Sequence, residues 1–142
     1  MAIRFKHILL IALLISAVHL TAVALGWYER TVWAVDGPLH FLGGILAAMV
    51  FLRLTQKPAQ EQVRPLYAFF AILGATLAGS LLWELFEFSM LKLAPTFATQ
   101  YKLYSTSPAD LLSDLGFGAA GGLVLACIFI RKGQRPSPPP DS

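Results

Sequence analysis

The sequence predicts an all-α integral membrane bundle of four transmembrane helices, and three observations lead to that prediction. Of the 142 residues, 56% are hydrophobic and only 13% are charged, whereas roughly a quarter of the residues in soluble domains are charged. Four stretches are long and apolar enough to cross a bilayer, which takes about 20 helical residues, and lysine and arginine gather at one set of their ends. We therefore expect a single transmembrane domain over residues 1–132, followed by a disordered, Pro-rich cytoplasmic tail over residues 133–142.

The four predicted spans follow the apolar stretches in chain order. They cover approximately residues 8–27, 36–54, 66–91 and 108–130. An alternative for the first stretch is a cleaved signal peptide, because Arg4 and Lys6 precede an apolar run that ends in a cleavage-like Ala22-Val23-Ala24. His19 inside that run favours a retained helix, and the sequence leaves the alternative open.

The distribution of lysine and arginine predicts the orientation. Eight of these residues would lie on one side: Arg4, Lys6, Arg53, Lys57, Arg64, Arg131, Lys132 and Arg135. Three would lie on the other: Arg30, Lys92 and Lys102. Cytoplasmic loops carry the excess, so we expect both termini to be cytoplasmic. These basic residues flank apolar segments and form no stripe, so the net charge of +3 does not indicate nucleic acid as a partner.

Three pairs of ionisable residues interrupt the last three spans. They are Asp36 with His40, Glu84 with Glu87, and Asp110 with Asp114. Each pair is three or four residues apart and so shares one helix face. In the predicted orientation, all six residues fall within about 10–12 Å of the outer interface. Ionisable groups at membrane depth are costly and usually face a partner, a cavity or a ligand, so we expect them to converge in one outward-facing polar site.

Small residues continue these faces toward the inner side and predict close helix packing. Gly118 and Gly122 have the GxxxG spacing, and Gly44 with Ala48 forms a similar small-residue pair. The first span has only scattered alanine and serine, so we expect it at the periphery of the bundle. The one cysteine, Cys127, excludes an intrachain disulfide and indicates no metal motif.

Structural interpretations of the pairs stay open beside the functional one. Residues 107–110 (Ser-Pro-Ala-Asp) have the pattern of a capping box with proline at the first helical position, and Asp36 before Gly-Pro could cap a helix that starts there. No cap position explains Glu84 or Glu87, so a structural role for them would need a cationic partner. The candidate partners are Lys92, Arg30 and Lys102.

The motifs around the three pairs resemble those of the YjdF-type bacterial inner-membrane proteins, which look related to the VanZ-like family. The motifs are Asp36-Gly-Pro-Leu-His40-Phe-Leu-Gly43-Gly44, Trp83-Glu84-Leu-Phe-Glu87-Phe and Asp110-Leu-Leu-Ser-Asp114-Leu-Gly116-Phe-Gly-Ala. The resemblance implies a small multi-pass protein of the bacterial inner membrane, with these polar residues as a family feature, and it supplies no mechanism. Two positions depart from the pattern: Glu87 stands where VanZ-like proteins often carry Gln, and Thr106 where relatives often have a further Asp.

Five carboxylates and one imidazole predict a divalent-cation site. The candidate ligands are Asp36, His40, Glu84, Glu87, Asp110 and Asp114. Mutual repulsion disfavours so many negative charges unless a cation compensates. Carboxylates suit Mg²⁺, Ca²⁺ or Mn²⁺, and an imidazole admits Zn²⁺ or Fe²⁺. Should the site be catalytic, its depth points to lipid head groups or lipid-linked cell-envelope precursors, whose phosphoryl oxygens a metal would polarise.

Two other classes of function remain as alternatives. Chains of acidic residues and histidine also mark proton or cation transport, although the inner halves of the second and fourth spans are mostly apolar. A non-enzymatic scaffold or assembly factor would use the same residues as a hydrogen-bonded structural network. Membrane lipid is the expected partner; a lipid-linked substrate, a homo-oligomer and enzymatic activity itself are left open.

Overall fold

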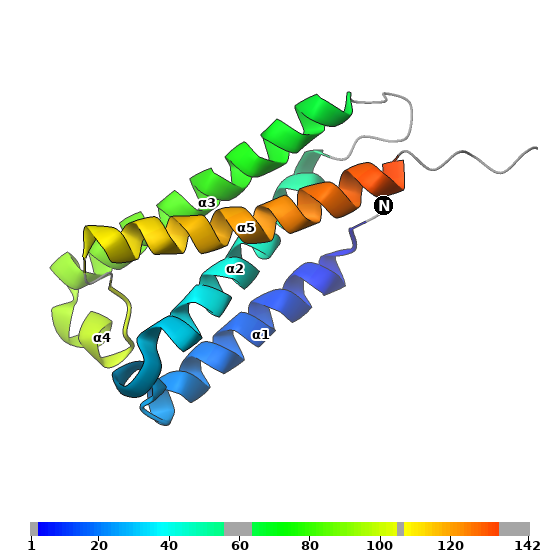
Figure 1. Ribbon diagram of the computed structural model, residues 1–142. Helices are drawn as coiled ribbons and strands as arrows, with labels where there is room; N and C mark the ends of the chain where they lie inside the picture. The colour runs from blue at the N-terminus through cyan, green and yellow to red at the C-terminus, as the bar shows by residue number, and fades with distance from the viewer. Residues whose placement is uncertain (1–2, 56–63, 105–106, 134–142) are drawn as a thin grey trace, which may run out of the picture.

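The computed structural model describes residues 3–55, 64–104 and 107–133, apart from the side chains of residues 31–33, 132 and 133. The described chain is helical, as predicted (Figure 1). Its elements are α1 (Phe5–Ala24), α2 (Trp27–Thr55), α3 (Pro65–Leu93), the short α4 (Pro95–Gln100) and α5 (Pro108–Gly133). Four of these helices are long and apolar enough to cross a membrane, which confirms the predicted fold class.

The predicted tail and one motif position cannot be compared with the structure. Gly133, the first residue assigned to the tail, is the last residue of α5, and residues 134–142 lie outside the described part of the chain. Thr106 lies outside it as well. The cytoplasmic location of the termini stays a prediction.

The second helix begins nine residues before Asp36, so the interpretation of Asp36 as an N-terminal cap is wrong. Gly26, with φ at 65°, makes the turn after α1, and α2 starts at Trp27. Positive φ suits glycine because it has no Cβ. Asp36 and Pro38 therefore lie inside α2. Proline in a helix interior removes one backbone hydrogen bond, and the helix continues through it, which the Asp-Gly-Pro pattern did not predict.

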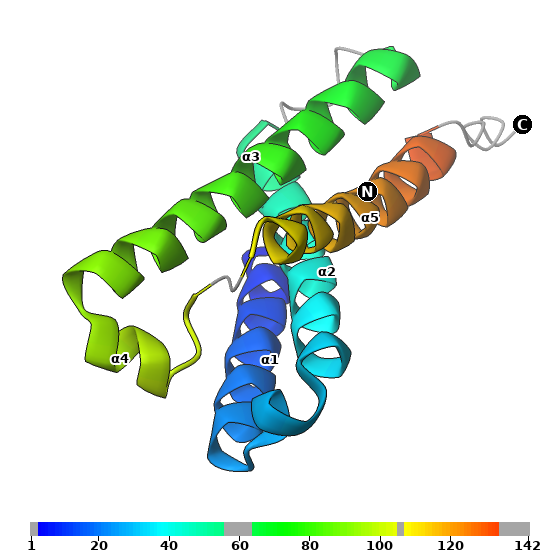
Figure 2. The same cartoon turned by 60° about the vertical axis from the view of Figure 1, so that its left-hand side comes forward.

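A seam of glycines brings α5 into contact with both α2 and α3, as the small-residue spacing predicted. A Cβ added to Gly44 would overlap the backbone of Gly118, and one added to Gly121 would overlap the backbone of Phe41. At these positions only glycine permits such a close approach. By contrast, α1 packs mainly on α2, at the edge of the bundle (Figure 2), as expected for the first span.

The third helix buries one narrow polar stripe and exposes apolar residues around it. Its buried residues are Ile72, Thr76, Ser80, Glu84 and Glu87. Steps of four and three residues keep them on a single face. Large apolar side chains such as Leu82 and Phe88 are exposed on the remaining surface, where lipid can surround them. The polar face of α3 therefore points into the bundle.

An apolar core occupies the end of the bundle that carries the termini, and the polar residues lie toward the opposite end. This core contains Ala48, Leu52, Ile72, Leu125 and Ala126. It lies more than one helical turn from His40 on α2 and from Asp114 on α5. Close packing at one end thus positions the three helices whose other ends carry the ionisable pairs.

Candidate metal centre

His40 lies between three carboxylates from three helices. Its Nε2 atom is 3.7 Å from Oδ1 of Asp36 and 3.8 Å from Oδ1 of Asp114. Its Nδ1 atom, across the ring, is 3.8 Å from Oε1 of Glu84. Helices α2, α3 and α5 contribute these four residues. The predicted convergence of the three pairs is therefore found for both residues of the first pair and for one residue of each of the others. These residues are Asp36 and His40, Glu84, and Asp114.

Three of these residues have the geometry of a metal-binding group. Asp36, His40 and Asp114 each offer one ligand atom, and these atoms lie within 4.8 Å of one another. Nitrogen and oxygen ligands bind divalent ions at about 2.0–2.6 Å, so ligands on opposite sides of one ion are about 4–5 Å apart. His40 and Asp114 are on different helices, so the group depends on the tertiary fold. The arrangement could hold one divalent cation.

Glu84 is the buried carboxylate without a hydrogen-bond partner. Its side chain is 5% exposed, and neither carboxylate oxygen has a partner among the described residues. A buried charge that lacks compensation costs several kcal/mol. The shortest approach, to Nδ1 of His40 at 3.8 Å, is longer than a hydrogen bond. A positive charge at the centre would lower this cost.

The cations that the sequence offered as structural partners interact elsewhere. Lys92 places its Nζ atom 5.5 Å from the centre of the Phe88 ring, and Nζ of Lys102 is 2.8 Å from Oε1 of Glu29. Within the described chain, neither lysine nor Arg30 forms an ion pair with Glu84 or Glu87. The structural ion pairs that the sequence left open as an alternative are therefore not found among the described residues, and each lysine has a nearer partner.

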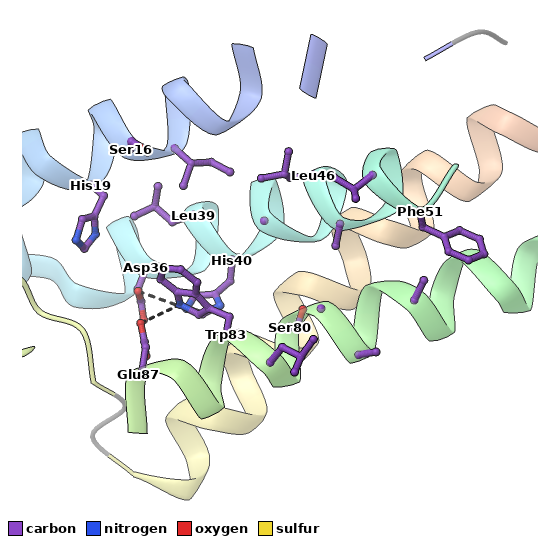
Figure 3. Close-up of a pocket in the computed structure, with 18 of the residues that line it drawn as sticks. Ser16, His19, Asp36, Leu39, His40, Leu46, Phe51, Ser80, Trp83 and Glu87 are labelled. Carbon is purple, nitrogen blue, oxygen red and sulfur yellow. Dashed lines mark hydrogen bonds and ion pairs between the residues drawn. The ribbon is translucent and has the colours of Figure 1, made fainter. Parts of the chain in front are cut away.

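Glu87 is held by its own helix. The indole Nε1 of Trp83 donates a hydrogen bond of 2.9 Å to its Oε1 atom. Figure 3 shows Glu87 and Asp36 pointing toward one another from α3 and α2. Trp83 was not among the predicted site residues. The four-residue spacing, which places the two side chains on one face, was the signal that could have identified it.

Asp110 takes part in the N-terminal cap of α5. Its backbone N–H donates to Oγ of Ser107 at 3.2 Å, and the helix begins at Pro108. This confirms the predicted capping pattern at this end, while a ligand role for the Asp110 side chain stays a prediction. Asp110 is buried, at a helix N-terminus whose dipole favours negative charge.

A groove of about 680 Å³ reaches the candidate metal centre at one of its ends (Figure 3). Three polar residues that line it were not among the predicted metal ligands: His19, Tyr28 and Lys102. Nδ1 of His19 and the hydroxyl of Tyr28 are 2.8 Å apart. Burial, and then the charges of Asp36 and Glu87, raise the pKa of the Tyr28 hydroxyl, which keeps it neutral. Contacts between α1 and α2 across a turn carry no fixed spacing, so no sequence pattern marks this pair.

The comparisons with known proteins identify a family and no characterised relative. A family model described as "Predicted membrane protein (DUF2238)" matches residues 1–135. No curated protein and no solved structure matches the chain.

Proposed function

This chain belongs to the DUF2238 family of predicted membrane proteins, and we propose that it binds one divalent cation near the periplasmic face of the bacterial inner membrane. The ligands are Asp36, His40 and Asp114, whose ligand atoms lie within 4.8 Å of one another. Glu84 lies behind the imidazole, next to Nδ1. Carboxylates commonly orient metal-bound histidines from this position, which separates the role of Glu84 from that of the three ligands.

The observation that carries the proposal is the buried carboxylate of Glu84 without a hydrogen-bond partner. A satisfied structural network would not leave both oxygens unpaired, because buried polar groups are normally hydrogen-bonded. A cation at Nε2 of His40 would fix the proton on Nδ1, facing Glu84. It would also offset the repulsion between Asp36 and Asp114. One ion thereby accounts for all four residues.

The donor set narrows the kind of ion. One imidazole nitrogen with carboxylate oxygens suits Mn²⁺ or Zn²⁺, whereas Mg²⁺ and Ca²⁺ prefer oxygen alone. The carboxylate of Glu87 accepts a hydrogen bond from Trp83, so it is not counted among the ligands. We therefore place Mn²⁺ and Zn²⁺ ahead of Mg²⁺ and Ca²⁺ as candidates for this site.

The cation would serve to bind phosphate. In the predicted orientation the site lies at the depth of the outer-leaflet head groups, and a divalent cation polarises phosphoryl oxygens. Lipid phosphates and lipid-linked cell-envelope precursors are the anionic groups at this depth. The resemblance to YjdF-type inner-membrane proteins agrees with a role in the cell envelope and adds no reaction.

The transport alternative has less support from the packing. Inward from Glu84 the polar residues of α3 are Ser80 and Thr76. The Thr76 hydroxyl donates to the Ile72 carbonyl at 2.9 Å, and the apolar core around Leu125 follows. A relay of protons or ions needs a continued polar path through that core, so binding at one face is the better proposal.

A direct test is Mn²⁺ binding to the full-length protein purified in detergent and stripped with EDTA. Free Mn²⁺, followed by its electron paramagnetic resonance signal, should disappear with a stoichiometry of one per chain. Asp114→Asn removes a ligand charge at nearly constant shape and should weaken binding at least about 10-fold, the effect typical of a lost metal interaction. Zn²⁺ should compete for the same site.

The matched control is Glu29→Gln, the same loss of charge at an exposed carboxylate that pairs with Lys102. It should bind Mn²⁺ like the wild type. Size-exclusion profiles establish that both variants are folded. Absence of stoichiometric Mn²⁺ and Zn²⁺ binding to the wild type overturns the proposal, and so does equal weakening in Asp114→Asn and Glu29→Gln.

A further inference from the structure

The groove beside the candidate metal centre is long enough to take a whole phospholipid acyl chain. Its lining runs along α2 from Asp36 to Leu54, about 27 Å at 1.5 Å per residue, whereas one leaflet makes up about half of the roughly 30 Å hydrocarbon core of a bilayer. Its volume of about 680 Å³ lies within the range of about 300–1,000 Å³ typical of small-molecule sites. Its dimensions therefore suit one long, narrow ligand.

Small residues and a missing helix contact create this groove. Gly43 and Ala47 on α2 and Ala75 and Gly79 on α3 line it, and α2 and α3 are in close contact there, since a Cβ added to Gly79 would lie 2.9 Å from Cβ of Ala47. Helix α1 packs on α2 and makes no comparable contact with α3, and Figure 1 shows α1 and α3 on opposite sides of the bundle. The space between them thus opens sideways, toward the surrounding lipid.

The ionisable side chains that line the groove lie at one end of it. That end holds Asp36, His40 and Glu87 from the centre described above, together with Tyr28 and Lys102. From Gly43 to Leu54, the α2 side of the lining is entirely apolar. A ligand that complements this surface has a charged head and a hydrocarbon tail.

We propose that the groove binds one acyl chain of an anionic membrane phospholipid, with the lipid phosphate at the metal centre. The inference rests on the proposed cation site for the phosphate contact and names the substrate class of that site. The chain lies over Gly43 and Leu46, and the second acyl chain stays in the bilayer. Entry is lateral, between α1 and α3.

Charge complementarity requires the cation. Asp36 and Glu87 alone would repel a phosphate, whereas a divalent ion held by Asp36, His40 and Asp114 presents a positive charge at the end of the groove. Lys102 lines the same end and is paired there with Glu29, so the positive charge that offsets Asp36 and Glu87 is that of the divalent ion. The pKa of Lys102 is raised by its hydrogen bond to Glu29, so this lysine is positively charged at neutral pH.

A helix from a second copy of the chain does not fit the same space. A 20-residue helix is about 30 Å long and about 10 Å across, which gives a volume on the order of 2,000 Å³. The groove holds about 680 Å³, enough for a hydrocarbon chain and too little for a helix with its side chains. A lipid is also the molecule that surrounds this opening at all times.

The test uses phosphatidylglycerol with a diazirine at the end of one acyl chain, as a minor component of phosphatidylcholine nanodiscs that hold the Mn²⁺-loaded protein. Illumination followed by peptide mapping should place the label on groove residues such as Leu46, Val50 and Phe51. Gly43→Leu should reduce this labelling several-fold. A Cβ at Gly43 meets nothing within 4 Å, so the leucine fills the groove with no backbone clash. Leu46→Trp is a second filling variant.

The matched control is Gly74→Leu on α3, where a Cβ likewise meets nothing within 4 Å and the position is exposed outside the groove. It should be labelled like the wild type. Wild-type-like labelling of the groove in both filling variants overturns the proposal. So does a label spread evenly over the lipid-facing residues of α3.

Removal of the cation separates this proposal from the proposed function. EDTA should reduce labelling by phosphatidylglycerol and leave labelling by diacylglycerol with the same diazirine chain unchanged, because diacylglycerol lacks the phosphate. A third result is possible, in which Gly43→Leu abolishes labelling by both probes and EDTA leaves both unchanged. This result supports the acyl-chain site and contradicts the phosphate contact. Stoichiometric Mn²⁺ binding without groove labelling retains the cation site and overturns the lipid site.

Discussion

Glu84 is the residue whose environment is most informative. Its two carboxylate oxygens are buried and unpaired within the described chain, while the neighbouring Glu87 accepts a hydrogen bond from Trp83. A buried charge reduces stability unless something compensates it, and natural proteins keep such residues mainly where function requires them. Glu84 should therefore trade stability of the metal-free protein for affinity toward the cation.

Replacement of the Glu84 carboxylate should change both the stability of the metal-free protein and its stabilisation by the cation. At pH 8 in EDTA, Glu84→Gln should raise the melting temperature, because a neutral amide lacks the desolvation cost of an unpaired buried carboxylate, which is several kcal/mol. Added Mn²⁺ should then stabilise the wild type more than the variant, since only tight binding to the folded state shifts unfolding. Differential scanning fluorimetry in detergent measures both shifts.

Glu29→Gln is the control for this prediction, because it removes a carboxylate that has a partner. It should give no gain of stability in EDTA. A lower melting temperature for Glu84→Gln than for the wild type in EDTA would show that the Glu84 carboxylate is already compensated within the protein.

At the scale of elements, one ion pair joins the loop between α3 and α5 to the first turn of α2. Nζ of Lys102, after α4, lies 2.8 Å from Oε1 of Glu29, in the first turn of α2. Lys102 has a positive φ of 55°, which is uncommon outside glycine. The loop between α3 and α5 is thus tied to the start of α2 at the end of the groove.

The pH range of this tie follows from the two pKa shifts. The hydrogen bond to Lys102 lowers the pKa of Glu29, so its contribution is present above the ordinary glutamate pKa and is lost as pH falls through the lowered value. The bond raises the pKa of Lys102, so that contribution is present below the ordinary lysine pKa and is lost as pH rises through the raised value. The tie should hold between about pH 4 and pH 10.

Charge reversal checks the tie inside that window. Glu29→Lys should lower the melting temperature at pH 7 through repulsion of Lys102, and Lys102→Glu added to it should restore most of the loss. At 1 M salt the difference between the single and the double variant should shrink, because exposed charges are screened. Additive losses in the double variant would contradict a direct pairing of the two residues.

The close approach of α2 and α5 at the glycine seam leads to a prediction about the stability of the bundle. A Cβ at Gly44 would overlap the backbone of Gly118, and neither helix backbone can move aside without loss of packing elsewhere. Gly44→Leu should therefore destabilise the bundle by about 1–3 kcal/mol or more, as overpacking does. The metal-binding group should be lost with it, because Asp114 lies one turn from Gly118 on α5.

Gly116→Leu is the matched control on the other face of α5. Gly116 is exposed, and a Cβ there meets nothing within 4 Å. Its melting temperature and Mn²⁺ binding should equal those of the wild type. Equal tolerance of leucine at Gly44 and Gly116 would mean that α2 and α5 do not approach as closely as the seam requires.

For the whole molecule, sequence periodicity predicted the fold and most of the site's location. Apolar length alone indicates a spanning helix, and helical spacing placed Asp36 with His40 and Asp114 on converging faces, which the distances around His40 bear out. The features that periodicity did not predict depend on tertiary contacts. The groove exists because α1 and α3 are separated, and Glu84 has no lysine partner within the described chain because Lys92 and Lys102 lie elsewhere.

Local signals failed where two of them competed. Asp36-Gly-Pro has the pattern of a helix start, yet α2 begins at Trp27, because the turn at Gly26 already ends α1. The Ser-Pro-Ala-Asp segment before α5 has the same kind of pattern and does start a helix. Pro65 and Pro95 also begin helices, without a side-chain cap before them. The feature that distinguishes Pro38 is therefore the earlier turn at Gly26, after which α2 has already begun.

Orientation decides which compartment supplies the ion and the lipid. Eight lysines and arginines flank the ends that carry the termini and three flank the opposite ends, and the candidate metal centre lies at the end with three. By the excess of positive residues in cytoplasmic segments, Gln100 should be periplasmic and Thr55 cytoplasmic. In a Cys127→Ser background, a membrane-impermeant maleimide should label Gln100→Cys in intact spheroplasts and Thr55→Cys only after permeabilisation. The reverse pattern would place the centre at the cytoplasmic face, where it would meet inner-leaflet phospholipids and cytosolic metal.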